Sequence, residues 1–464
     1  DQLRDQHVMA ETEAWFARTQ RIVEPLTLDL AVRRALSDNL DHAVLKIEHA
    51  IQAETETAAI LRTLPSLQTQ AEYRWLSELR IAESQSADTG VVSLEPSFSS
   101  ERDQKTAYFE VAFSLLDFGI SFFRARQEEN EHNILEERVR RSAQNLVLDV
   151  TEAYYRVFVA QQAVEGSRML RDRLQARRET IRQQIEQGRI TDLEGLQADE
   201  AFALVQIRIQ DFESELYKAK AELTTLMGLA PGSDFVLAPI DLEATPPRRT
   251  FDVKSLENEA LHGRPELWEQ DLKGLIATDE VRARIVNLFP NPTGFFGGET
   301  DQNEFLRHQG WWYAGARLSW DLLSIPRKAF ELREALATED LVAEQATLVA
   351  MGVLTQLRLA ILGYEDAAVH YELAANLDQV RQRILSSSEK HAGSGQLDEG
   401  SVLSAEADAL FARLRRLNAW VELLMAEKRI ENAVGRDAPG MPRNAPLPPP
   451  VEYSRAEQSE NWQK

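Results

Sequence analysis

The chain has 464 residues, of which 43% are hydrophobic and 27% charged, and its formal net charge at pH 7 is −23. This composition is typical of a folded protein, and the negative charge argues against nucleic acid as a partner. Because the chain contains no cysteine, disulfide bonds, thiolate metal sites and a cysteine nucleophile are excluded. No run approaches 18 apolar residues, so we predict no transmembrane helix; a β-barrel would be the remaining route into a membrane.

The first part of the chain combines a helix with two strand-like segments. Residues 1–25 form a polar N-terminal extension, and a helix is predicted from residue 26 to about residue 62. Two segments at about 68–81 and 105–116 then alternate between apolar and polar side chains, and residues 82–104 are predicted to be a loop. Alternation over some 10–12 residues is typical of a membrane β-strand.

A long helix is predicted from about residue 120 to residue 187, because the segment has no proline and Gly166 is its only glycine. At 1.5 Å per residue, such a helix is about 100 Å long. After a turn at Gly188, a returning helix is predicted at about 192–228. The apolar stripe of the long helix has the spacing of a coiled coil and comprises Val139, Ala143, Leu146, Val150, Ala153, Val157, Ala160 and Val164.

The same order of segments recurs, which predicts a duplicated unit with repeats at 26–228 and 251–435, a linker at 229–250 and a proline-rich tail at 436–464. The offset between the repeats is 225 residues at their beginnings and 210 residues along the long helices. The second repeat comprises strands at about 291–300 and 310–321, a long helix at about 327–392 and a returning helix at about 401–434.

The second returning helix carries two apolar seams. One contains Leu403, Ala407, Leu410, Leu414, Leu417, Val421 and Leu424, and the other Ala405, Ala409, Ala412, Ala419, Leu423, Ala426 and Ile430. Two seams predict a helix with a neighbour on each side, as in a wall of helices; burial in an ordinary bundle is the alternative. Since four strands cannot close a barrel and open edges are costly in lipid, the chain must self-associate if it enters a membrane.

Several motifs resemble the TolC-type outer-membrane efflux protein family. They are Leu26-Thr27-Leu28 with Ala35-Leu36 and Asn39, Leu64-Pro65-Ser66-Leu67, Ser114-Leu115-Leu116-Asp117-Phe118-Gly119, Ala153-Tyr154, and the Gly188 turn followed by Asp192-Leu193-Glu194-Gly195-Leu196-Gln197-Ala198. The resemblance covers residues 26–435. It implies a mainly α protein with a transmembrane β-barrel: a homotrimer whose 12-stranded barrel in the outer membrane continues into a 12-helix periplasmic tunnel. The implied partners are a periplasmic adaptor and an inner-membrane transporter, in drug efflux or type I secretion.

Two groups of residues are candidates for the site. Carboxylates near the two turns, Asp192, Glu194, Asp199, Asp398, Glu399 and Glu406, would form an acidic ring at a narrow tip. The alternative is that they stabilise helix N-termini. The aromatic residues Tyr73, Trp75, Trp311, Trp312 and Tyr313 suggest a membrane girdle, or else the core of a sheet.

The sequence contains no pattern typical of an enzyme. The eight histidines are dispersed, and there is no phosphate-binding loop or nucleophile elbow, so we expect no cofactor and no metal site. We therefore predict an outer-membrane exit duct gated at its periplasmic helix tips. The alternative is a soluble coiled-coil scaffold or adaptor, which would not need the four alternating strands.

Overall fold

The computed structural model describes residues 4–5, 8–9, 13, 22, 24–79, 81–86, 88–98, 100–187, 191–230, 232–240, 248–393 and 399–442. The chain divides into two compact units, which are described separately. One unit comprises Asp1–His49, Leu135–Glu269 and Thr347–Lys464, and the other Ala50–Ile134 and Gln270–Ala346. Asp398 lies outside the described residues.

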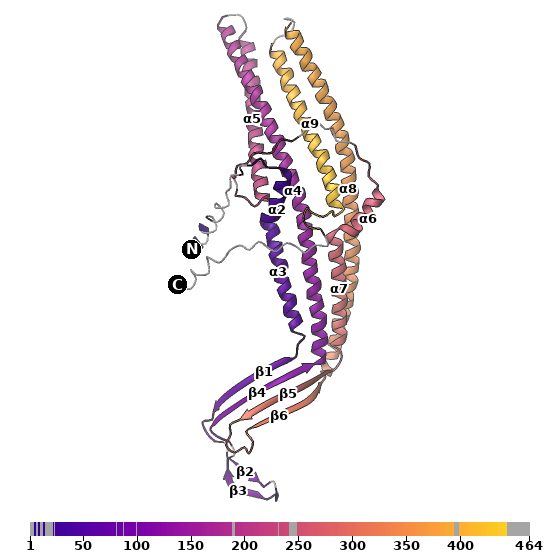
Figure 1. Ribbon diagram of the computed structural model, residues 1–464. Helices are drawn as coiled ribbons and strands as arrows, with labels where there is room; N and C mark the ends of the chain where they lie inside the picture. Colours follow the sequence, from indigo (N-terminus) through magenta and orange to yellow (C-terminus); the bar gives the residue numbers. More distant parts are fainter. Residues whose placement is uncertain are drawn as a thin grey trace. The chain divides into compact units, whose positions relative to one another are not determined.

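The second of these units contains a four-stranded antiparallel sheet in the order β1-β4-β5-β6 (Figure 1). Its strands are β1 (Ser66–Trp75), β4 (Asp103–Ser114), β5 (Asn291–Asp301) and β6 (Gly310–Ser319). The two central strands, β4 and β5, come from different halves of the sequence, so the halves share one sheet.

The connection between β1 and β4 differs from the prediction in two respects. The first strand ends at Trp75 rather than near residue 81, and the predicted loop contains the paired strands β2 (Ala82–Gln85) and β3 (Val92–Ser97). The serine and glycine residues that suggested a loop instead make the turn of this hairpin: the amide of Gly90, at φ +67°, donates to the Ser86 carbonyl over 3.0 Å. Glycine adopts such a φ without a steric cost.

Most of the chain is helical. The helices are α2 (Leu28–Asp38), α3 (Leu40–Leu61), α4 (Leu115–Glu186), α5 (Asp192–Leu226), α6 (Val253–Gly263), α7 (Pro265–Val286), α8 (Ile325–Gly393) and α9 (Glu399–Ala433). The single helix predicted at 26–62 is wrong, because it is broken at Asn39. There the Asn39 side-chain oxygen accepts the backbone N–H of His42 over 3.0 Å, which starts a new helix as an N-cap does.

The two seams predicted on the last helix are confirmed within the first unit. Leu417 of α9 belongs to a buried cluster with Val150 and Val157 of α4, whereas Leu423 and Ile430 belong to another cluster on α8. Helix α9 therefore has a neighbour on each side, as a wall of helices requires.

Helix α8 is more apolar than the sequence analysis allowed. Within the described residues, the helical stretch Leu322–Ala392 contains an 18-residue window with a mean hydropathy of 1.6, of which 17% is buried. By length and composition alone it could cross a membrane, a test that the core helices of soluble proteins also pass. One side of α8 packs in the core through Val353, Leu357 and Ile361.

The helix breaks at Asn39 and Arg264 have the same architecture. The Asn39 amide donates to the Leu226 carbonyl at the end of α5 over 3.1 Å. Arg264 donates to the Asn432 and Ala433 carbonyls at the end of α9 over 3.3 and 3.4 Å. In both cases a side chain from a break between two helices satisfies carbonyls that a helix end leaves without partners.

A glycine with positive φ follows each returning helix at these junctions. Gly228 has φ +67° and Gly435 φ +77°. An added Cβ would lie 2.1 Å from the Asp38 carbonyl oxygen at Gly228, and 2.7 Å from the Gly263 carbonyl oxygen at Gly435. Both the conformation and the close backbone approach therefore require glycine.

The junction at Asn39 also buries a histidine. His42 is 1% exposed, and its Nδ1 lies 3.2 Å from the Ser142 hydroxyl. Burial, with a further contribution from the charge of Lys46, lowers the His42 pKa from 6.5 to about 4. Because folding thus disfavours the charged imidazole, the unfolded chain binds more protons between these two pH values.

We expect the free energy of unfolding to fall by roughly 2–3 kcal/mol as the pH drops from about 6.5 to about 4, since one pKa unit corresponds to about 1.4 kcal/mol. The measurement is urea unfolding across this range, followed by circular dichroism. His42→Asn removes the titrating group and should flatten this part of the profile. An unchanged pH dependence in that variant would contradict the assignment.

Candidate functional site: the two sheet faces and the helix turns

The register of the sheet separates an apolar face from a polar one. Residues paired across neighbouring strands share a face, and consecutive residues in a strand point to opposite faces. Thr69 pairs with Phe109, Phe109 with Gly298, and Gly298 with Trp312. The face that contains this row also carries Leu67, Ala71, Tyr73, Trp75, Ala107, Val111, Phe113, Phe296, Ala314, Ala316 and Leu318.

Large side chains on this apolar face are exposed in the single chain. Leu318 is 70% exposed, Trp312 69% and Leu67 66%. Trp312 also contacts two other rings of this face: it packs edge-on against Phe109 and stacks on Phe296, with ring centroids 5.4 and 5.6 Å apart. An exposed, continuous apolar surface of this kind is typical of an interaction with lipid or another chain.

The opposite face is largely polar and internally hydrogen-bonded. The Tyr108 hydroxyl donates to Gln70 over 3.0 Å, and the Tyr313 hydroxyl donates to Glu110 over 3.1 Å. The face also carries Gln68, Glu72, Arg74, Ser114, Glu299 and Arg317. A sheet with one apolar and one polar face can separate lipid from water.

The five predicted girdle residues do not share one face. Tyr73, Trp75 and Trp312 lie on the apolar face, whereas Trp311 and Tyr313 lie on the polar face. The prediction overlooked that three consecutive strand residues cannot all point in one direction. A girdle role stays a prediction for the first three residues only.

The predicted tip carboxylates are only partly described. The backbones of Asp192, Glu194 and Glu399 belong to the first turns of α5 and α9, and the helix-dipole alternative stays a prediction for them. Asp199 forms an ion pair with Arg178 of α4. Glu406 of α9 lies 2.5 Å from Arg173 of α4. An acidic ring stays a prediction.

Ion pairs connect the long helices near these turns. Besides Arg178–Asp199, the pair Arg168–Glu213 joins α4 to α5 over 2.7 Å. Arg381–Asp408 joins α8 to α9 over 2.9 Å. The Arg173–Glu406 pair differs from these because it joins α4 to α9, and thus one pair of helices to the other.

A cluster of buried charges lies at the Arg264 junction and was not predicted from the sequence. Arg264 is 3% exposed; Glu266 lies 3.1 Å from it and 2.7 Å from Arg141 of α4. Burial lowers the Arg264 pKa, as does the charge of Arg141, while Glu266 opposes both effects. Arg264 also donates to Gln356 of α8 over 2.7 Å. Arg141 and Gln356 are distant in sequence from Arg264 and Glu266, and the only local signal was Gly263-Arg264-Pro265, a helix-breaking tripeptide.

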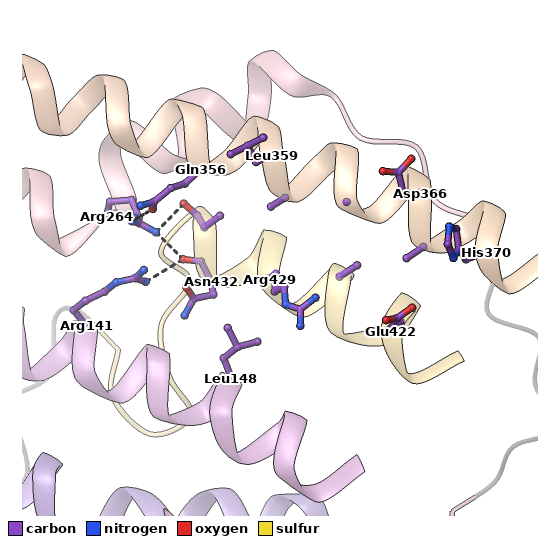
Figure 2. A pocket seen from close by; sticks show the side chains of 15 residues that line it. Arg141, Leu148, Arg264, Gln356, Leu359, Asp366, His370, Glu422, Arg429 and Asn432 are labelled. Carbon is purple, nitrogen blue, oxygen red and sulfur yellow. Dashed lines mark hydrogen bonds between the residues drawn. The ribbon is translucent and has the colours of Figure 1, made fainter. Parts of the chain in front are cut away.

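This cluster closes one end of a groove between α4, α8 and α9 (Figure 2), with a volume of about 520 Å³. Figure 2 shows Arg141, Arg264 and Asn432 together at one end, and His370 and Glu422 at the other. Among the residues that the structure describes, no group of three or more His, Cys, Asp or Glu side chains is arranged to hold a metal ion.

A sheet with one apolar face, whose strands pass directly into long paired helices, is the fold of outer-membrane channels. The outer-membrane channel OprN has 18% sequence identity and a TM-score of 0.71, with 91% of this chain and 92% of that chain covered. The CmeC outer membrane channel of Campylobacter jejuni has 13% sequence identity and a TM-score of 0.71, with 88% of this chain and 85% of that chain covered. The Neisseria gonorrhoeae MtrE outer membrane channel, solved in its open state, has 14% sequence identity and a TM-score of 0.70, with 88% of each chain covered.

The sequence comparison points to the same group. Residues 32–229 match the family model described as outer membrane efflux protein. This match confirms the resemblance to the TolC-type outer-membrane efflux protein family that the motifs suggested. No curated protein matches the sequence. The similar proteins are outer-membrane channels, not enzymes.

Proposed function

We propose that the chain is the exit duct of a tripartite efflux or type I secretion system. In this proposal the sheet lies in the outer membrane and the long helices extend into the periplasm. An adaptor protein and an inner-membrane transporter would deliver the substrates. The observation that carries the proposal is the division of the sheet into an exposed apolar face and a hydrogen-bonded polar face, because lipid and an aqueous lumen require these two surfaces.

We infer that the duct is a homotrimer and that each of its chains contains two structural repeats. Each of the outer strands, β1 and β6, pairs with one neighbour in the four-stranded sheet, and an unpaired edge in lipid costs several kcal/mol per group. Self-association of copies removes these edges. Three copies of the four-stranded sheet give the 12 strands that the family resemblance implies. We also propose that the two repeats of each chain are residues 26–228 and 251–435.

Planar-bilayer recording on the purified chain tests the duct. We expect stable insertion and stepwise ionic conductance. A soluble elongated oligomer that never inserts would overturn the proposal and favour the coiled-coil scaffold instead.

The ion pair Arg173–Glu406 supports a gate at the periplasmic helix turns, because it ties α4 to α9. Exposed pairs contribute about 0.5 kcal/mol each. Three symmetry-related pairs then contribute about 1.5 kcal/mol, or roughly a tenfold shift between closed and open states. We expect Arg173→Gln to raise the conductance severalfold in single-channel recordings.

Arg168→Gln is the matched control, since its pair with Glu213 lies between α4 and α5 and does not join the two helix pairs. Equal conductance in the two variants would place the gate elsewhere. A rise in the Arg173 variant alone supports a gate at this contact.

A further inference from the structure

A groove of about 520 Å³ runs between α4, α8 and α9 (Figure 2), and the proposed duct assigns it no role. Helix α6 packs on a different side of α8. There Leu256 of α6 shares a buried cluster with Leu357 of α8, whereas the nearby residues Gln356 and Leu359 line the groove. The described part of the chain therefore leaves the groove uncovered and free to hold a ligand.

The closed end of the groove carries a positive charge. Arg264 and Arg141 both contact the single carboxylate of Glu266, so two cations face one anion there. Arg264 is 3% exposed, and its Nε atom has no hydrogen-bond partner among the described residues. A buried donor without a partner is costly. This end therefore suits a ligand group that is anionic and accepts hydrogen bonds.

The other end of the groove carries the opposite charge. Asp366 and Glu422 line it, together with the imidazole of His370 (Figure 2). Both carboxylates are exposed, and neither forms a hydrogen bond or an ion pair with the residues that the structure describes. With a neutral imidazole, the formal charge of this end is about −2 at pH 7. A cationic ligand group is complementary to it.

The middle of the groove is mostly apolar. Its lining there includes Leu148, Leu359 and Ala426. The one charged side chain between the two ends is Arg429 (Figure 2), and it pairs with Glu152 of α4 over 3.3 Å. Gly363 also lines this part, and no atom lies within 4 Å of a Cβ added to it. The middle therefore has room for an uncharged segment of a ligand.

The length of the groove limits the ligand. Gln356, which accepts a hydrogen bond from Arg264, marks the positive end, and Asp366 lies ten positions later on α8. At 1.5 Å per residue the two ends are about 15 Å apart. An extended peptide advances about 3.3 Å per residue, so four or five residues cover this distance. At neutral pH such a peptide carries an ammonium group at one end and a carboxylate at the other.

We propose that the groove binds short extended peptides. The C-terminal carboxylate lies at Arg141 and Arg264, and the N-terminal ammonium group lies at Asp366 and Glu422. The apolar middle contacts the side chains of the peptide. This inference rests on the proposed duct and names one class of solute that its helical part binds.

Titration calorimetry on the purified protein tests the match of charges. The probe is a pentapeptide of alanine and leucine with free termini. Its N-acetylated form lacks the ammonium group, and its C-terminal amide lacks the carboxylate. We expect saturable binding of the free peptide. Each blocked form should bind about tenfold more weakly or worse, because a hydrogen bond to a charged group is then lost.

Two glycine variants test the position of the site. Gly363→Leu places a side chain in the empty middle of the groove and should abolish binding of the free peptide. Gly352→Leu is the matched control, because an added Cβ at Gly352 also meets no atom within 4 Å, while this residue does not line the groove. Circular dichroism and the oligomer mass verify that both variants fold.

The outcomes separate this inference from the proposed function. Weaker binding of both blocked peptides, with loss of binding in Gly363→Leu alone, supports the site. Equal binding of the three peptides, or equal binding in the two glycine variants, overturns it. A chain that forms pores in planar bilayers but binds no peptide overturns the inference and leaves the duct intact. Peptide binding by a chain that never forms pores supports the groove and overturns the duct.

Discussion

Gly228→Ala is expected to lower the free energy of unfolding by about 3–5 kcal/mol. An L-residue at φ +67° costs roughly 1–2 kcal/mol in backbone strain. The added Cβ would also lie 2.1 Å from the Asp38 carbonyl oxygen, so the α2–α3 break or the end of α5 must move. That movement disturbs the Asn39 bond to Leu226 as well. Thermal and urea unfolding of the purified protein, at one fixed concentration, measure the loss.

Gly440→Ala is the matched control for this prediction. Gly440 has a similar φ of +78°, but no atom lies within 4 Å of an added Cβ. It therefore reports the backbone strain without the steric overlap, and we expect a loss of only about 1–2 kcal/mol. Equal losses in the two variants would show that close packing at Gly228 contributes nothing.

Arg264→Ala is expected to destabilise the protein by about 3–5 kcal/mol, the range found when one partner of a buried ion pair is removed. The substitution removes the donor to the Gln356 side chain and to the Ala433 carbonyl, and it leaves the Asn432 carbonyl with Arg141 as its donor. It also removes one of the two arginines beside Glu266. Because these partners belong to α7, α8 and α9, the loss should appear in the main unfolding transition.

Arg358→Ala provides the comparison for Arg264→Ala. Arg358 forms a 2.7 Å ion pair with Glu257, but its side chain is 67% exposed. An exposed pair contributes about 0–1 kcal/mol, so this variant should unfold nearly as the natural chain does. If the free energy of unfolding falls by the same small amount in both arginine variants, the burial of Arg264 does not stabilise the junction.

The sequence was most informative where a regular period extended over many residues. The long helices followed from the absence of proline together with apolar spacing. The two seams of α9 followed from apolar spacing, and Leu417 and Leu423 do lie on different sides of that helix. The helix break at Asn39 was missed because the apolar pattern continues through it. A single side chain, which caps the next helix, interrupts the hydrogen bonding there.

The candidate site was less predictable than the fold. Trp311, Trp312 and Tyr313 were grouped by residue type, whereas the strand geometry sends Trp312 to one face and its two neighbours to the other. The cluster of Arg141, Arg264 and Glu266 could not be predicted, because Arg141 lies more than a hundred positions before Arg264 and Glu266. Such contacts depend on how the helices pack, and no local pattern encodes them.

The proposed duplication would also affect how readily the proposed homotrimer forms. Because both proposed repeats belong to one chain, the contacts between α4 and α9, such as the Arg173–Glu406 ion pair, form within each molecule. An intramolecular contact forms at a high effective concentration and costs less translational entropy than one between separate molecules. Fewer encounters between molecules would then complete the proposed homotrimer. The two halves of the chain can also differ in sequence, since Asn39 at one helix break and Arg264 at the other both donate to carbonyls at a helix end.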